Sequence, residues 1–402
     1  MRKGLTLLVC LAILLVPSLR ASGQAGVELM DVQADYVFGE KITFSATLQA
    51  DSAIQEAYLL FQVQGDSNTH TFPLVISDKG KLVYIHLVRD GVIRPFSRLA
   101  YWFHIVLADG DLFDSDKYYL QYDDDRYNWQ TIENSSLSLH WSAGGLPFGQ
   151  AAFNAADSGL RSIQNLLPPG NGDPIRIYIY PSVAELQTTL DQGNVAWTAG
   201  HSLPDLGVAL VSIAPGETQS IEMERQIPHE LAHILLYRLA GPAYPNLPAW
   251  LSEGIATQAE LYPNTDYVEA LNLAVKNKTL LPLASLCGPF PDDASAAMLA
   301  YAESGSFIRY LVQTYGASSL TGIIHEYMDG LTCEQGTVQT TGLTLTQLEH
   351  AWQRTSLGEK TAGTALKNLI PYLLLLIFAL LIPLGAWLFR PGRGQNGGNE
   401  SH

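Results

Sequence analysis

The chain has 402 residues, of which 47% are hydrophobic and 15% are charged, and its formal net charge is −16. This composition is that of a folded protein long enough for two ordinary domains, which excludes a largely disordered chain. The acidic balance also excludes a nucleic-acid partner, because phosphate contacts need clustered Lys and Arg.

The N-terminus has the pattern of a secretory signal peptide. Met1 to Lys3 is basic, residues 4–17 are apolar, and small residues follow up to Gly23. We therefore expect residues 1–23 to be a signal peptide, with an uncleaved signal anchor as the alternative.

Residues 24–125 alternate between apolar and polar side chains. Four such segments, separated by turn residues, predict short strands at 41–48, 56–63, 81–88 and 98–107. Together they predict an all-β sandwich, and the stretch YWFHIV resembles the late strands of immunoglobulin-like or fibronectin-type modules. The acidic run Asp123 to Arg126 then marks a boundary. It reads as a solvated linker, since it lacks the spaced ligands of a calcium loop.

Residues 126–360 predict a second, α+β domain, because strands come first and helices follow. Alternation predicts strands at 136–141, 175–180 and 207–214, with helices at 149–167 and 183–190 between them. From Asp266 onward the pattern is mainly helical, at 296–315, 318–328 and 344–352.

The segment IPHELAHILL (227–236) places titratable groups in an apolar helix. His229 and His233 are four residues apart, so they project from one face and can share one metal ion. This is the H-E-x-x-H pattern, in which Glu230 would act as general base. The metal helix is expected to start near Arg225 to Pro228, since proline is harmless only in a first turn.

A third ligand is needed for a catalytic zinc site, and the segment LPAWLSEGIA (247–256) offers one. Pro248 can begin a helix there, and Glu253 lies within its apolar stretch. A carboxylate in such a place is costly unless a cation compensates it. We therefore predict a zinc site of His229, His233 and Glu253.

HELAH followed downstream by WLSEG resembles the gluzincin metallopeptidases of the thermolysin-like and aminopeptidase-like group. It is most similar to the peptidase-MA-like domains of bacterial surface proteins, over about Trp129 to Leu357. The resemblance implies a gluzincin catalytic domain with a His, His, Glu zinc site and Glu230 as catalytic base.

The resemblance also implies an oxyanion donor and a strand that binds substrate. The segment LAYAESGSFI looks like the family's tyrosine-bearing helix, which makes Tyr301 the expected donor. His201 is the competing candidate, although a structural imidazole is the better reading of it. The strand 207–214 is expected to be an edge strand that pairs with substrate peptide, with an ordinary buried strand as the alternative.

Two cysteines, Cys287 and Cys333, remain after removal of the signal peptide. In an oxidising compartment they can form one disulfide, although two unrelated buried thiols would give the same pattern.

Near the C-terminus, Leu369 to Phe389 contains no charged residue. A helix of that length spans about 31 Å, enough to cross a bilayer, so we predict a transmembrane helix over 367–390. Arg390 and Arg393 follow it, which favours a cytoplasmic tail at 391–402. The protein is thus expected to be single-pass in the cell membrane, with its N-terminal domains extracytoplasmic.

These patterns predict a membrane-anchored zinc metallopeptidase that acts on peptides or proteins. An endopeptidase is favoured, because no motif for a free substrate N-terminus precedes the metal helix. Two alternatives stay open: a non-catalytic surface module that keeps the fold for binding, and an enzyme of the cell envelope with a non-peptide substrate. Glu230 counts against the first, because a binding module gains nothing from it.

Overall fold

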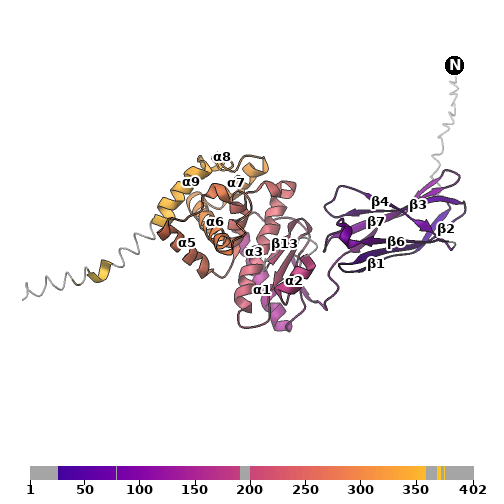
Figure 1. Ribbon diagram of the computed structural model, residues 1–402, viewed down its shortest axis with the longest axis horizontal. Helices are drawn as coiled ribbons and strands as arrows, with labels where there is room; N and C mark the ends of the chain where they lie inside the picture. The colour runs from indigo at the N-terminus through magenta and orange to yellow at the C-terminus, as the bar shows by residue number, and fades with distance from the viewer. Residues whose placement is uncertain (1–25, 78, 191–199, 359–368, 373–374, 376–402) are drawn as a thin grey trace, which may run out of the picture. The chain divides into compact units, whose positions relative to one another are not determined.

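The computed structural model of the protein describes residues 26–77, 79–190, 200–358, 369–372 and 375. The chain divides into two compact units, each with a hydrophobic core of its own. One contains Met1–Asn128 and Gln187–Ala196, and the other contains Trp129–Leu186 and Trp197–His402 (Figure 1). The division after Asn128 lies close to the predicted domain boundary after Asp125.

The first unit consists of two antiparallel sheets. Their strand orders are β1-β2-β6-β5 and β4-β3-β7-β8, with β9 also paired to β7. The strands are β1 (Val27–Val37), β2 (Lys41–Ala50), β3 (Ile54–Val63), β4 (His70–Pro73), β5 (Val75–Ile76), β6 (Lys81–Leu87), β7 (Arg98–Leu107), β8 (Leu112–Asp114) and β9 (Tyr118–Gln121), and the short 3-10 helix η1 (Val88–Asp90) follows β6.

Alternation along the strands builds the core of this unit, because every second residue of β2 and β7 is buried. Phe44 of one sheet lies 6.0 Å from Phe61 and 5.0 Å from Tyr101 of the other, measured between ring centroids. The two sheets therefore share one core, as the sequence predicted for an all-β unit. The assignment to an immunoglobulin or fibronectin type stays a prediction.

The second unit begins with a five-stranded sheet of order β10-β11-β12-β14-β13. The strands β11, β12 and β14 run parallel, while β10 and β13 are antiparallel to their neighbours. Their bounds are β10 (Gln130–Glu133), β11 (Leu137–Trp141), β12 (Ile175–Tyr180), β13 (Gly200–Leu203) and β14 (Val208–Ser212).

Helices make up the rest of this unit. They are α1 (Leu146–Ile163), α2 (Val183–Leu190, whose residues from Gln187 on are counted in the first unit), α3 (Gln219–Ala240), α4 (Ala249–Ala259), α5 (Thr265–Asn277), α6 (Ala294–Tyr315), α7 (Ser318–Met328), α8 (Val338–Thr341) and α9 (Leu345–Trp352). Shorter turns are the 3-10 helices η2 (Pro204–Leu206), η3 (Gly241–Asn246) and η4 (Leu283–Leu286) and the π-helix η5 (Gln353–Leu357). Strands before helices give the predicted α+β class.

Helix α3 occupies the middle of the second unit, with α1 and the sheet on one side and α5 to α9 on the other (Figure 1). Buried residues of α1 and α3 pack against Leu139, Ile177 and Val211 of the three parallel strands. Buried residues of α4 and α6 complete the same core. Helix α3 can therefore place side chains against the sheet on one side (the sheet lobe) and against the later helices on the other (the helical lobe).

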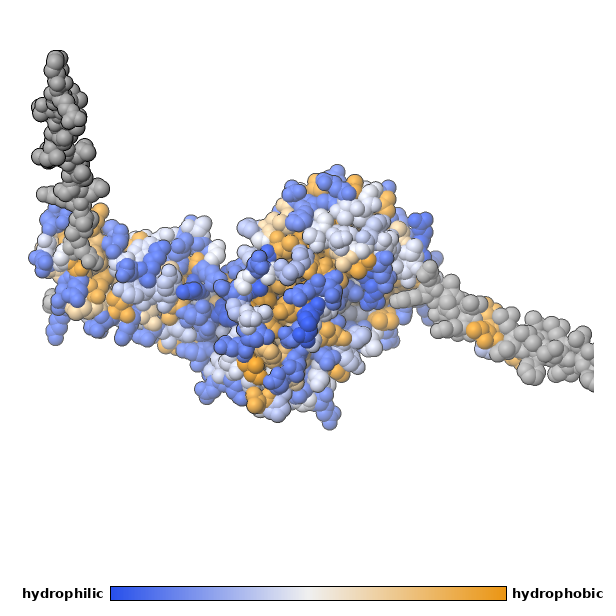
Figure 2. All heavy atoms as spheres, turned by 180° about the vertical axis from the view of Figure 1, so that it is seen from behind, coloured by the Kyte–Doolittle hydropathy of each residue, from blue (hydrophilic) through white to orange (hydrophobic). Residues whose placement is uncertain are grey.

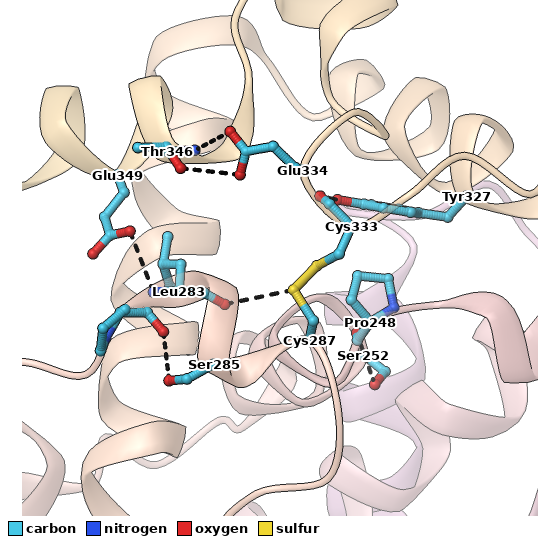
Figure 3. The surroundings of a disulfide bond; sticks show 11 residues. Pro248, Ser252, Leu283, Ser285, Cys287, Tyr327, Cys333, Glu334, Thr346 and Glu349 are labelled. Carbon is cyan, nitrogen blue, oxygen red and sulfur yellow. Dashed lines mark hydrogen bonds between the residues drawn. A yellow bond between two sulfur atoms is a disulfide. The ribbon is translucent and has the colours of Figure 1, made fainter.

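A disulfide joins Cys287 and Cys333, whose Cα atoms lie 6.1 Å apart (Figure 3). Of the two alternatives left by the sequence, the bridge is the correct one. The carbonyl of Cys287 also accepts a hydrogen bond from the backbone N–H of Ala249 at 3.2 Å, at the first residue of α4. The tyrosine hydroxyl of Tyr327 donates to the carbonyl of Cys333 at 2.8 Å. The bridge thus fixes the segment from which α4 starts.

Among the residues that the structure describes, no helix combines the length and the apolar character needed to cross a bilayer. Most of the predicted span 367–390, the tail 391–402 and the predicted signal peptide 1–23 lie outside the described residues. On the face drawn in Figure 2, hydrophilic residues cover most of both units and apolar residues are exposed among them.

Candidate metal centre

The two histidines of the HELAH segment lie one turn apart on α3. Their ring centroids are 5.2 Å apart, and His233 is buried while His229 is largely covered. Their spacing on a regular helix is what turns both imidazoles toward the same point, as predicted from the sequence.

Helix α3 begins at Gln219, so the prediction that it starts near Arg225 to Pro228 is wrong. Pro228 lies inside the helix and cannot donate to the carbonyl of Glu224. That carbonyl instead accepts the backbone N–H of Leu261 at 2.8 Å. Gly159 of α1 makes room for the proline ring, because a Cβ added there would lie 2.7 Å from its Cγ. The helix therefore continues through the proline with its free carbonyl satisfied.

Glu253 of α4 completes a group of three side chains. One carboxylate oxygen lies 3.3 Å from Nε2 of His229 and 3.5 Å from Nε2 of His233. The three donor atoms lie within 4.8 Å of one another. Gly254 lets α4 approach α6 closely, since a Cβ there would come within 2.6 Å of Ile308. Two imidazoles and one carboxylate converging on one point are a donor set that fits zinc.

Each histidine also has a partner at its other ring nitrogen. Nδ1 of His229 lies 3.2 Å from a carboxylate oxygen of Glu260, and Nδ1 of His233 lies 3.2 Å from the hydroxyl of Tyr244. Partners at Nδ1 orient the rings and leave Nε2 to face Glu253. This is the second layer of contacts that metal-binding histidines commonly have.

The charges of the group support one another. Burial alone would lower the pKa of His229, but its hydrogen bonds to Glu253 and Glu260 outweigh this and raise the pKa to about 10. Burial would raise the pKa of Glu253, but the two imidazoles outweigh this and hold it well below its usual range. Glu253 is therefore an anion in the folded protein, as a metal ligand must be, whereas binding of a metal would release the proton that the raised pKa leaves on His229, because a ligand imidazole must be neutral.

The side chain of Glu230 lies beside the three candidate ligands, and it is acidic and buried. Burial raises the pKa of its carboxyl group, while His229 and His233 oppose that shift. The hydroxyl of Ser202 also opposes the rise in the pKa of Glu230, so its side chain lies close to the carboxylate. A Cβ added to Gly200 would lie 2.5 Å from Oε1 of Glu230, so the carboxylate rests against bare backbone.

The structure brings Tyr301 near the group as well. Its ring centroid is 6.0 Å from that of His229, and it stacks on Tyr267 at 6.2 Å. Burial raises the pKa of the Tyr301 hydroxyl, and Glu253 adds to the shift. Tyr301 therefore keeps its proton at neutral pH and can donate a hydrogen bond.

The prediction of an edge strand at 207–214 is wrong. Strand β14 is fully buried and has β12 and β13 on either side, so the alternative of an ordinary buried strand is correct. Among the described strands, β13 is the edge on this side of the sheet. It carries His201, whose pKa is lowered by burial and by the nearby His233.

The sequence reasoning missed Glu260, Tyr244, Ser202 and Gly200. A signal existed only for Glu260, which lies seven residues after Glu253 and so two turns along the same helix face. The other three residues belong to β13 and η3, and no spacing in the sequence ties them to HELAH.

The fold and the site together define a class: an α+β unit with a candidate metal centre on its central helix. The sequence model of the Peptidase MA superfamily matches residues 155–358, just over half of the chain. The chain therefore belongs to the Peptidase MA superfamily, as the HELAH and WLSEG segments predicted. No curated protein matches the sequence.

Two solved structures illustrate what the chain is similar to. One is an M1 zinc metallopeptidase from Deinococcus radiodurans, at 14% identity, covering 82% of this chain and 94% of that chain with a TM-score of 0.38. The other is a family 56 carbohydrate-binding module that binds β-1,3-glucan, at 10% identity, covering 23% of this chain and 99% of that chain with a TM-score of 0.17. Neither likeness is close enough to assign a function.

Proposed function

We propose that the protein is a gluzincin-type zinc metallopeptidase that hydrolyses peptide bonds. His229, His233 and Glu253 would hold zinc, and Glu230 would act as general base. The observation that carries the proposal is that the ligand atoms of two imidazoles and one carboxylate converge beside the buried carboxyl group of Glu230. A bound zinc ion would supply a Lewis acid and lower the pKa of a water molecule.

The position of Glu230, directly after His229 on α3, supports a role in proton transfer. As general base it accepts a proton from the attacking water and passes it to the nitrogen of the leaving amine. Burial raises the pKa of its carboxyl group, which suits a residue that must gain and lose a proton near neutral pH.

Tyr301 is the proposed donor to the oxyanion that develops on the scissile carbonyl. Its burial and raised pKa keep the hydroxyl protonated, and its ring lies beside that of His229. His201 on β13 is the alternative donor.

The test uses the whole chain and its Glu230→Gln variant, with zinc content and cleavage of a mixed peptide library measured side by side. We expect about one zinc ion per chain in both, and cleavage at least about 100-fold slower in the variant. Glu222→Gln, the same substitution in the first turn of α3, is the matched control and should cleave like the parent.

The possible outcomes distinguish the proposed enzyme from a binding module and test each assigned residue role. Zinc in both proteins without cleavage in either would favour a binding module over an enzyme. Cleavage that persists in Glu230→Gln would remove Glu230 as the base. Absence of zinc from the parent would overturn the ligand assignment.

We also propose that the protein is held in the cell membrane by residues 367–390, with its N-terminal domains outside the cytoplasm. The apolar run and the signal-like N-terminus support this, as does the bridge between Cys287 and Cys333, since disulfides belong to oxidising compartments. Carbonate extraction of membranes should leave the chain in the pellet and release a variant truncated before residue 367. Release of the whole chain would contradict the anchor.

A further inference from the structure

Strand β13 presents two residues to the carboxylate of Glu230. Gly200 and Ser202 are two residues apart on one strand and so face the same side. The Cα of Gly200 leaves so little room that an added Cβ would meet Oε1, Cδ and Cγ of Glu230 at 2.5, 3.1 and 3.2 Å. The side chain of Ser202 lies close enough to the same carboxylate for its hydroxyl to act on the pKa of Glu230 as a hydrogen-bond donor would.

We propose that Gly200 and Ser202 are positioning residues that hold the general base. The missing Cβ at Gly200 lets the carboxylate of Glu230 lie directly against the backbone of the strand, and the hydroxyl of Ser202 lies on the same side of the strand, where it can donate to that carboxylate. This inference rests on the proposed role of Glu230. It adds that the edge strand β13, and not α3 alone, determines the position of the Glu230 carboxylate.

Alanine at Gly200 isolates the steric part of this arrangement. The backbone of Gly200 is not in the left-handed region, so alanine adds no backbone strain there. The new methyl group would displace the carboxylate of Glu230 by roughly 1 Å, a misplacement that can cost on the order of 100-fold in rate. Because the three atoms nearest to the added methyl group all belong to Glu230 and not to a ligand, zinc content should not change.

The experiment compares four forms of the whole chain: the parent, Gly200→Ala, Glu230→Asp and the double variant. Gly200→Ala should lower kcat by about 10- to 100-fold with KM and zinc content unchanged. Aspartate withdraws the carboxylate by one methylene and so makes room for the methyl group. In the Glu230→Asp background, Gly200→Ala should therefore cost less than about 3-fold, which is strong non-additivity between neighbours.

Controls keep the result decisive. Gly216→Ala, where an added Cβ meets nothing within 4 Å, should match the parent. Ser202→Ala should lower kcat several-fold at unchanged KM, whereas Ser202→Thr, which keeps the hydroxyl, should restore most of it. If Gly200→Ala fails to fold, the Ser202 pair alone decides the proposal.

The outcomes distinguish this inference from the proposed function. Equal costs of Gly200→Ala in both backgrounds, or an unchanged kcat, would overturn the positioning role while leaving Glu230 as the base. Full activity of Glu230→Asp and Glu230→Gln would instead overturn the base, and this inference with it.

Discussion

Glu303 shows how a single buried carboxyl group can set a pH dependence. It lies on α6 with no exposed surface, and its Oε1 accepts the backbone N–H of Leu281 at 2.9 Å. Its Oε2 has no hydrogen-bond partner within the described part of the chain. Burial, reinforced by the nearby Glu349, raises the pKa of Glu303 to about 8. The folded protein therefore holds this proton more tightly than the unfolded chain does.

The raised pKa predicts a loss of stability as the pH increases. The contribution of Glu303 is complete below the unfolded pKa of about 4.3 and is lost as the pH rises toward about 8, by up to about 1.4 kcal/mol per pH unit. Glu303→Gln imitates the protonated form, so its free energy of unfolding should not show this loss. Urea unfolding from pH 5 to pH 8 measures it. Parallel curves for parent and variant would show that Glu303 ionises normally.

At the residue scale, the sequence predicted those side chains of the candidate site that lie within one motif. His229, Glu230 and His233 share one helix, and helical periodicity fixes their relative positions. Glu253 could be added because a carboxylate in an apolar helix needs a compensating charge. Gly200 and Ser202 could not be predicted, because their proposed role depends on which strand lies beside α3. That pairing is a product of tertiary packing, which no local pattern encodes.

At the element scale, Pro228 in α3 links two parts of the candidate site. Its missing N–H leaves the Glu224 carbonyl free, and this carbonyl accepts the N–H of Leu261 at 2.8 Å. Leu261 directly follows Glu260, whose carboxylate lies 3.2 Å from Nδ1 of His229. A backbone hydrogen bond missing from α3 thus frees a carbonyl that anchors the chain just after α4, next to the residue that orients a candidate ligand.

This arrangement predicts that Pro228→Ala weakens zinc binding while preserving the helix. The alanine N–H would compete with Leu261 for the Glu224 carbonyl and loosen Glu260. Loss of such an indirect contact typically costs about 10- to 100-fold in metal affinity, so we expect the lower part of that range. Competition with a chromophoric chelator measures the dissociation constant.

Glu260→Gln supplies the matched comparison for that experiment. Combined with it, Pro228→Ala should add little, because both act through the same contact to His229. Fully additive effects would mean that the proline acts elsewhere, for instance through its packing on Gly159.

The elements that the sequence predicted well are those with strong periodicity. The strand Ile175–Tyr180 and the helices Val183–Leu190 and Ser318–Met328 have the predicted bounds. The start of α3 was misplaced because the proline rule ignores a carbonyl that finds a partner elsewhere. Strand β13 was missed because four residues are too few to show alternation. The edge of the sheet was misassigned for the same reason.

At the scale of the whole molecule, the two units have separate hydrophobic cores. The sequence predicted this division because the compositional pattern changes at the acidic run near Asp124, from short alternating strands to mixed elements. The candidate ligands and both bridged cysteines belong to the second unit. Zinc and the disulfide should therefore stabilise that unit and leave the first unchanged.

Calorimetry of the whole chain tests this separation. A ligand at about 1,000 times its dissociation constant stabilises the folded state by about 4 kcal/mol, which shifts a domain of this size by about 10 °C. We expect two transitions, of which one rises by that amount when zinc is restored after chelation. Reduction of the disulfide should lower the same transition, since a bridge across 46 residues contributes up to about 4 kcal/mol.

His229→Ala should abolish the zinc shift and keep the effect of reduction. If zinc moved one transition and reduction the other, the assignment of the site and the bridge to one unit would be wrong, because a ligand stabilises only the unit whose native state binds it.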